Sequence, residues 1–185
     1  RRYREAAEYY KMAFSLLKDS LLLRNALYNA AVSYKNLGEA DSAVAYYKKV
    51  AELFSDTEDA LDALFSLAYF LEEKGESEKA LNYFLDLEGE LRKPQDEIEL
   101  LYWLGETYMK LKKPGEALQC FRRIYLFHPD AENWAVTAKL EAARAFISMG
   151  QKGKARTLLE NVVRERGETD EFGKAALQQL RALTP

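Results

Sequence analysis

Residues 75–84 read Gly-Glu-Ser-Glu-Lys-Ala-Leu-Asn-Tyr-Phe, and the plan of this stretch recurs along the chain. An alanine stands at positions 6, 43, 80, 117 and 155, so successive alanines are 37, 37, 37 and 38 residues apart. A large apolar residue follows each alanine by four residues: Tyr10, Tyr47, Phe84, Phe121 and Leu159. A small residue with a large one a helical turn later indicates two helices in close contact. Recurrence at this period predicts a solenoid of stacked helical units.

The apolar periodicity predicts helices throughout and no strand. We expect one domain over 1–185, with full repeats at 24–60, 61–97, 98–135 and 136–169. The unpaired second helix of a truncated repeat occupies 1–22, and a capping helix occupies 170–185. The expected first helices are 25–37, 61–74, 97–111 and 133–149, and the second helices are 41–54, 78–91, 116–127 and 152–166. Gly38, Gly75 and Gly150 fall between them, where a left-handed residue ends a helix at least cost.

Composition excludes several classes of function. Apolar residues make up 48% of the 185 residues and the net charge is −3 without a long block of like charge, so nucleic acid is a poor partner. No apolar run approaches the roughly 18 residues of a membrane helix, so we expect no direct membrane insertion. One cysteine, Cys120, and one histidine, His128, cannot build the usual metal site. With no phosphate-binding glycine loop, we expect no catalytic residue, metal or cofactor, and no enzyme.

Trp103-Leu104-Gly105, Tyr108, Ala117, Phe121 and Pro129 together resemble the tetratricopeptide repeat, a helix–turn–helix unit of about 34 residues. The position of Gly105 in this motif is filled in the other units by Ala31, Ala68 and Ala143. The resemblance implies an all-α fold, a right-handed α-solenoid of helix–turn–helix repeats. The units here are longer than the family's, which is similar to bacterial cell-envelope members such as the Tol–Pal coordinator and outer-membrane assembly lipoproteins. That likeness implies the periplasm or cell envelope, although the residues themselves indicate no compartment.

The resemblance also implies that the first helices line a concave groove, which binds a peptide or helix of a partner protein. Helical spacing predicts which side chains face it: Tyr28, Val32, Phe65, Tyr69, Glu72, Tyr102, Glu106, Met109 and Arg144. The row that contains Tyr28 fits packing between neighbouring helices as well as it fits ligand contact. Tyr69 and Arg144 are less easily explained by packing, and an acidic group of the ligand would suit Arg144.

The alternative function is that of a structural scaffold or self-assembly segment of a larger multi-repeat protein. The expected helix at 2–18 carries Ala6, Tyr10, Ala13 and Leu17 on one face, yet no first helix precedes it. Uncovered apolar surface tends to find a partner. We therefore predict either a further repeat upstream in the native protein or self-association through this N-terminal helix.

Overall fold

A computed structural model describes residues 2–16, 20–54, 58–88 and 93–183. The described residues form α-helices with no strand among them. By Cα proximity the chain divides into two compact units, residues 1–91 (unit 1) and 92–185 (unit 2). The predicted single domain over 1–185 stays a prediction, and each unit is described by itself.

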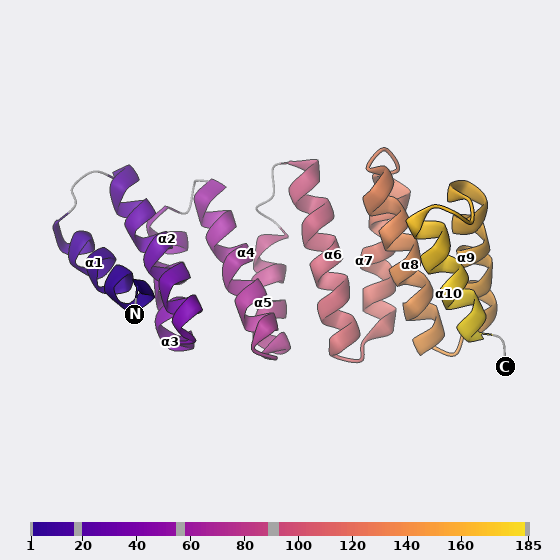
Figure 1. The fold of residues 1–185 in the computed structure, drawn as a ribbon, viewed down its shortest axis with the longest axis horizontal. Helices are drawn as coiled ribbons and strands as arrows, with labels where there is room; N and C mark the ends of the chain where they lie inside the picture. The colour runs from indigo at the N-terminus through magenta and orange to yellow at the C-terminus, as the bar shows by residue number, and fades with distance from the viewer. Residues whose placement is uncertain (1, 17–19, 55–57, 89–92, 184–185) are drawn as a thin grey trace. The chain divides into compact units, whose positions relative to one another are not determined.

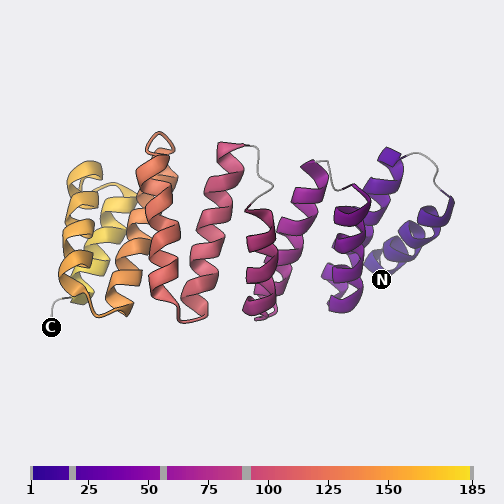
Figure 2. The ribbon, with the colours of Figure 1, turned by 180° about the vertical axis from the view of Figure 1, so that it is seen from behind.

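Unit 1 contains α1 (Arg2–Leu16), α2 (Ser20–Leu37), α3 (Ala40–Leu53), α4 (Glu58–Glu73) and α5 (Ser77–Leu87). Each helix packs against the next one along the chain. Within this unit α3 and α5 lie on one side, nearer the viewer in Figure 2, while α2 and α4 lie on the other. One apolar cluster joins α1 to α4 through Ala7, Tyr34, Ala43 and Phe70.

Unit 2 contains α6 (Pro94–Lys110), α7 (Pro114–Phe127), α8 (Glu132–Ser148), α9 (Lys152–Arg166) and α10 (Glu171–Leu183). Here too each helix packs on its successor, and α10 also contacts α8. A larger cluster on α8, α9 and α10 includes Leu140, Leu159, Val162 and Leu183. Packing between sequence neighbours is the mark of a solenoid. The predicted all-α helical-repeat solenoid is thus confirmed.

The alanines of the repeat are buried as the period predicts. Ala43, Ala80, Ala117 and Ala155 have no exposed surface, and the large residues that follow them are at most 2% exposed. The prediction for the first alanine is wrong, because Ala7 is buried at 1% exposure while Ala6 is only partly covered. The reason is geometric: α1 packs against α2, the helix that follows it, so Ala7 faces the neighbour. Tyr10 is partly buried, Leu17 lies outside the described residues, and the side chain of Ala13 is not described.

Several helix starts differ from the expected ones. The first helices α2, α4 and α6 begin at Ser20, Glu58 and Pro94, which is up to five residues earlier than predicted. Pro94 suits the first turn of α6, since its missing N–H would have no partner there. The second helix α5 ends at Leu87, short of the expected residue 91. The last helix begins after Asp170, whose Oδ1 instead accepts a hydrogen bond from Phe172 N at 2.9 Å.

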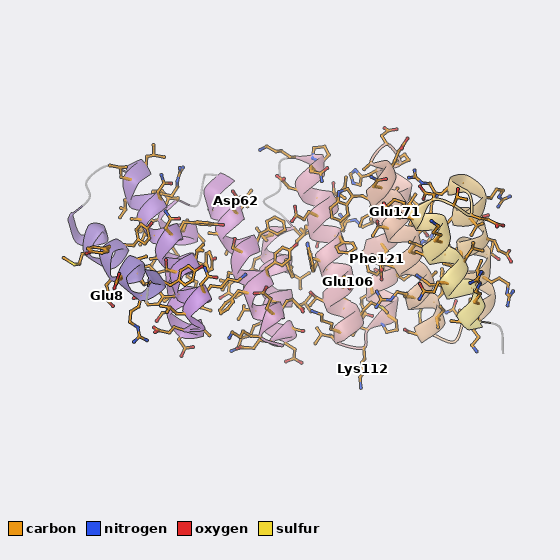
Figure 3. The ribbon with its side chains drawn as sticks, in the orientation of Figure 1. Glu8, Asp62, Glu106, Lys112, Phe121 and Glu171 are labelled. Atoms are coloured by element: carbon orange, nitrogen blue, oxygen red, sulfur yellow. The ribbon has the colours of Figure 1, made fainter. Side chains whose placement is uncertain are left out.

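The turn between the two helices of a repeat contains a left-handed residue. Gly38, Gly75 and Gly150 have φ values of 76°, 77° and 74°, which confirms their predicted role. The equivalent residue between α6 and α7 is Lys112, whose φ is 58°, the one positive value at a non-glycine residue in the described part of the chain. A left-handed conformation costs an L-residue about 1–2 kcal/mol relative to glycine. Lys112 lies at the tip of its turn (Figure 3).

We therefore expect Lys112→Gly to raise the free energy of unfolding by about 0.5–1 kcal/mol, because glycine removes the strain but loses more entropy on folding. Urea unfolding measures the change. Lys113→Gly is the matched control, since Lys113 is equally exposed but has a φ of −113°, and it should bring no gain. Destabilisation by Lys112→Gly would contradict the argument.

Candidate functional site

The predicted groove residues of unit 1 lie on α2 and α4. Tyr28, Val32, Phe65 and Tyr69 are all partly buried, so each keeps part of its side chain exposed. Glu72 differs, because it is only 7% exposed and offers a ligand little surface. The predicted row is therefore exposed on these helices except at its acidic member.

The aromatic rings of the first helices also pack inside their own repeats. Tyr28 stands edge-on to Tyr47 at a centroid distance of 5.7 Å. Phe65 and Tyr69 meet Phe84 in the same way, at 6.4 and 6.5 Å. Edge-to-face pairs at this distance are favourable. One side of each ring thus holds its helix pair together, and only the remaining surface is available to a ligand.

Tyr28 also links the two first helices of unit 1. Its hydroxyl lies 2.9 Å from Ser66 Oγ, which joins α2 to α4. Burial, together with the neighbouring Tyr28, raises the pKa of Tyr47 to about 12. The phenol of Tyr47 therefore stays neutral at ordinary pH. The structural reading of the Tyr28 row is supported for Tyr28 itself.

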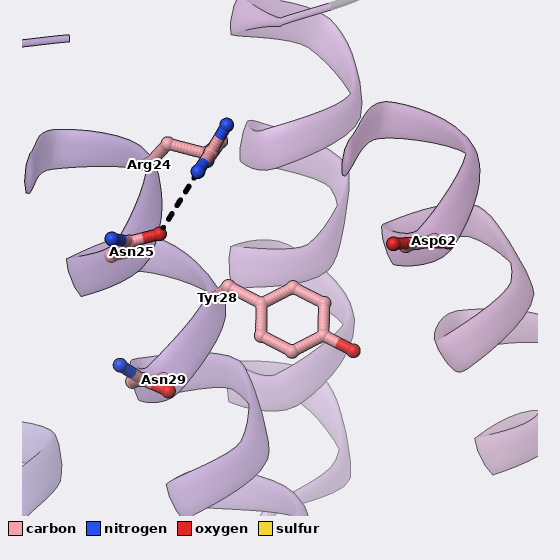
Figure 4. A pocket seen from close by; sticks show the side chains of 5 residues that line it. All are labelled: Arg24, Asn25, Tyr28, Asn29 and Asp62. Atoms are coloured by element: carbon pink, nitrogen blue, oxygen red, sulfur yellow. Dashed lines mark hydrogen bonds between the residues drawn. The ribbon is translucent and has the colours of Figure 1, made fainter. Parts of the chain in front are cut away.

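A small pocket of about 200 Å³ opens beside Tyr28 (Figure 4). Arg24, Asn25, Tyr28 and Asn29 from α2 line it together with Asp62 from α4. Arg24 Nη2 donates a hydrogen bond to Asn25 Oδ1 at 3.3 Å. The two asparagines were not among the residues predicted from the sequence, although their spacing of four residues places them on one face of the helix.

In unit 2 the predicted residues Tyr102, Glu106 and Met109 lie on α6, and Arg144 lies on α8. Tyr102 packs on Phe121 of its own repeat at 6.2 Å and on Trp134 of α8 at 5.3 Å. Tyr102, Glu106 and Met109 are partly buried, and the side chain of Arg144 is 48% exposed. The structure therefore brings Tyr102, Glu106 and Arg144 together at the face shared by α6 and α8.

A glutamate that the sequence analysis did not single out completes this group. Arg144 Nη1 contacts Glu141 Oε2 and lies 3.7 Å from Glu106 Oε1, so one guanidinium nitrogen serves two carboxylates. Burial and the neighbouring Glu106 raise the pKa of Glu141 to about 7, although Arg144 opposes the shift. The pKa of Tyr102 is also raised, by burial and by the two glutamates. The site carries two acidic groups against one cation.

The described residues contain no cluster of metal-ligand side chains, since no three His, Cys, Asp or Glu side chains among them are grouped in that way. Cys120 is buried, as expected of a core residue. His128 caps the end of α7, with its Nε2 3.5 Å from Glu97 Oε2. None of the helices, so far as they are described, is long and apolar enough to cross a bilayer.

Comparison with known families assigns these helix pairs. Residues 25–57 and 98–131 each match a model of the tetratricopeptide repeat. The chain contains tetratricopeptide repeats. Tetratricopeptide repeats in general serve protein–protein interaction, and they are generally scaffolds rather than enzymes. In general terms the chain is therefore a protein–protein interaction module. The two matched segments include α2 with α3 and α6 with α7.

Solved structures share the fold at low identity. A putative kinesin light chain from Podospora anserina, with nearly identical tetratricopeptide-like repeats, is 16% identical with a TM-score of 0.67, covering 98% of this chain and 86% of that one. MamA from Desulfovibrio magneticus is 16% identical with a TM-score of 0.63, covering 98% and 87%. The apo form of RapI is 16% identical with a TM-score of 0.78, covering 98% of this chain but 53% of RapI. A comparison with curated proteins finds no match.

Proposed function

We propose that the chain binds a peptide or helix of a partner protein on the exposed faces of its first helices. In unit 1 these helices are α2 and α4, and in unit 2 they are α6 and α8. The chain is not an enzyme in this proposal, because tetratricopeptide repeats are generally scaffolds.

One observation supports the proposal above the others. The repeat fixes a small residue and a large one at the helix contact, yet the position one turn after the aromatic row varies freely: Val32 and Tyr69 in unit 1, Glu106 and Arg144 in unit 2. All four keep exposed surface. Because the same fold accepts such different side chains there, packing does not dictate them. Tyrosine and arginine are also common among residues that dominate binding energy.

We expect Tyr69→Ala to weaken partner binding by roughly tenfold or more, the loss typical of a residue at the centre of an interface. The measurement is recovery of partners from the native source, followed by titration of the recovered protein against both forms. Tyr83→Ala is the matched control, since it removes a partly buried tyrosine from α5, a second helix of the same unit.

Equal melting temperatures of the two variants would show that packing losses are the same. If Tyr83→Ala weakened the partner as much as Tyr69→Ala, the binding surface would not be that of the first helices. If neither variant lost affinity for the partner, the binding site would lie outside unit 1.

The second candidate function is self-assembly as part of a scaffold, and exposed apolar side chains on α1 favour it. Tyr3, Tyr9 and Met12 are 53%, 72% and 61% exposed. Tyr9 and Met12 are three residues apart and lie on one side of α1, where a second copy of α1 would cover them. We expect Tyr9→Glu to shift the chain to a monomer in light scattering across concentrations. A wild-type chain that is already monomeric at every concentration, with α1 helical, would exclude self-association.

The cell-envelope location stays a prediction.

A further inference from the structure

The charges on α6 and α8 are unbalanced where the two helices meet. Arg144 is the only cation that contacts Glu106 and Glu141 among the ion pairs of the described residues. The side chains of these glutamates are 21% and 15% exposed, so water screens them only in part. Glu106 Oε1 is an ion-pair distance of 3.7 Å from Arg144 and accepts no hydrogen bond. Above a pH of about 7, where Glu141 is ionised, one positive charge therefore faces two carboxylates.

The fold does not need these charges. In unit 1 the position of Glu141 is filled by Ser66, which meets the hydroxyl of Tyr28 at 2.9 Å. The positions of Glu106 and Arg144 are filled there by Val32 and Tyr69. Unit 1 thus builds the same helix pair with neutral groups. Partly buried ion pairs are in general a weak source of stability, so packing gives no reason for the acidic pair of unit 2.

We propose that Glu106 and Glu141 receive a lysine or arginine side chain of the partner protein, next to the ring of Tyr102. This inference rests on the proposed function and gives its ligand a charge. A second cation would bring the group to two positive and two negative charges. Tyr102 belongs to an aromatic cluster with Trp103 and Trp134, each at a centroid distance of 5.3 Å, and aromatic rings attract a nearby cation through their faces.

The opposite ligand charge fits less well. The sequence suggested an acidic ligand group beside Arg144, but two carboxylates of the chain already occupy that guanidinium. An acidic ligand would have to displace one of them, and it would add a third negative charge to a site of low exposure. Like charges at this distance repel each other, so the geometry points to a basic partner.

The test is selection of a random dodecapeptide display library on the whole chain at low salt and pH 8, where Glu141 is ionised. The site variant Glu106→Gln/Glu141→Gln removes both carboxylates. The control variant Glu132→Gln/Glu165→Gln has the same net charge, and it removes glutamates of α8 and α9 that are 80% and 47% exposed. All three proteins are compared only if their circular dichroism spectra and melting curves show folded helices.

Lysine or arginine should be enriched in peptides selected on the wild type and on the control variant, and not on the site variant. One selected peptide should bind the site variant roughly tenfold more weakly than it binds the wild type. The Lys→Gln form of that peptide should bind the wild type more weakly by a similar factor, roughly tenfold. Enrichment of acidic or uncharged peptides, or equal basic enrichment on the site variant, would overturn the inference and leave the proposed function standing. If no peptide is enriched on any protein, the proposed function fails, and the inference with it.

Discussion

Replacing Phe121 with alanine is expected to lower the free energy of unfolding by about 3–5 kcal/mol. The ring of Phe121 has no exposed surface, packs on Tyr102 at 6.2 Å and lies between α6 and α7. Its removal loses the burial of an aromatic side chain and leaves a cavity. Phe127→Ala is the matched control, since it removes the same side chain from the same helix where it is 74% exposed. Surface changes of this kind cost within about 0.5 kcal/mol. Equal losses in urea unfolding would contradict the assigned packing.

A substitution at Gly105 of α6 tests the same contact from the other helix. A Cβ atom built on Gly105 would lie 2.4 Å from Phe121 Cε1, which is too close for either atom to stay in place. Gly105→Ala should therefore cost about 1–3 kcal/mol, as overpacking does. Gly115→Ala is its control, because a Cβ there meets nothing within 4 Å.

The double variant Gly105→Ala/Phe121→Ala separates this clash from other causes. Without the ring, the added methyl group of residue 105 has room and fills part of the cavity. The double variant should therefore be no less stable than Phe121→Ala alone, so that the two losses do not add. Additive losses would show that Gly105 is required for some other reason, such as its effect on the helix backbone.

The period of the sequence was sufficient to predict the fold because a repeat buries the same positions every time. The recurrence of Ala80 and Phe84 in the other repeats predicts that all these positions are buried, since each repeat packs on its neighbours alone. The same logic failed at α1, where Ala7 rather than Ala6 is buried, because Ala7 is the residue that faces α2. Helix starts also differed, since Pro94 can open α6 without a hydrogen-bonded N–H.

The candidate site was predicted less completely, because the repeat pattern reports what the units share and a binding site depends on where they differ. Tyr102 and Tyr28 occupy the same position of their repeats, yet one meets the charged Glu141 group and the other meets Ser66. Predicting this contact requires knowing that positions on two successive first helices touch, which spacing along one helix does not show. Asn25 and Asn29 were missed for a similar reason, since their pocket also needs Asp62 from α4.

The second large effect that we expect is a dependence of the free energy of unfolding on pH through Glu141. Its carboxyl has an ordinary pKa of 4.5, and burial and then Glu106 raise it to about 7 in the folded chain. An unfolded chain thus ionises this group at lower pH than the folded chain does. The stability that the protonated form contributes is fully present below pH 4.5 and is lost as the pH rises to about 7. Above that pH the folded chain holds two ionised glutamates against Arg144.

We therefore expect Glu141→Gln to be more stable than the wild type at pH 8, by about 1–3 kcal/mol, and to lose most of this advantage at pH 5. The shift from 4.5 to about 7 corresponds to about 3.5 kcal/mol at about 1.4 kcal/mol per pKa unit, and loss of the ion pair with Arg144 reduces the expected gain below that limit. Urea unfolding of both proteins at the two pH values measures the difference, in which the titration of all other groups cancels. Glu132→Gln on the same helix is the control, since that side chain is 80% exposed and its change should stay within about 0.5 kcal/mol. A Glu141→Gln variant that is less stable at pH 8 would show that its ion pair with Arg144 outweighs the repulsion from Glu106. The acidic pair would then be a structural element, and the case for a basic ligand at this site would lose its electrostatic ground.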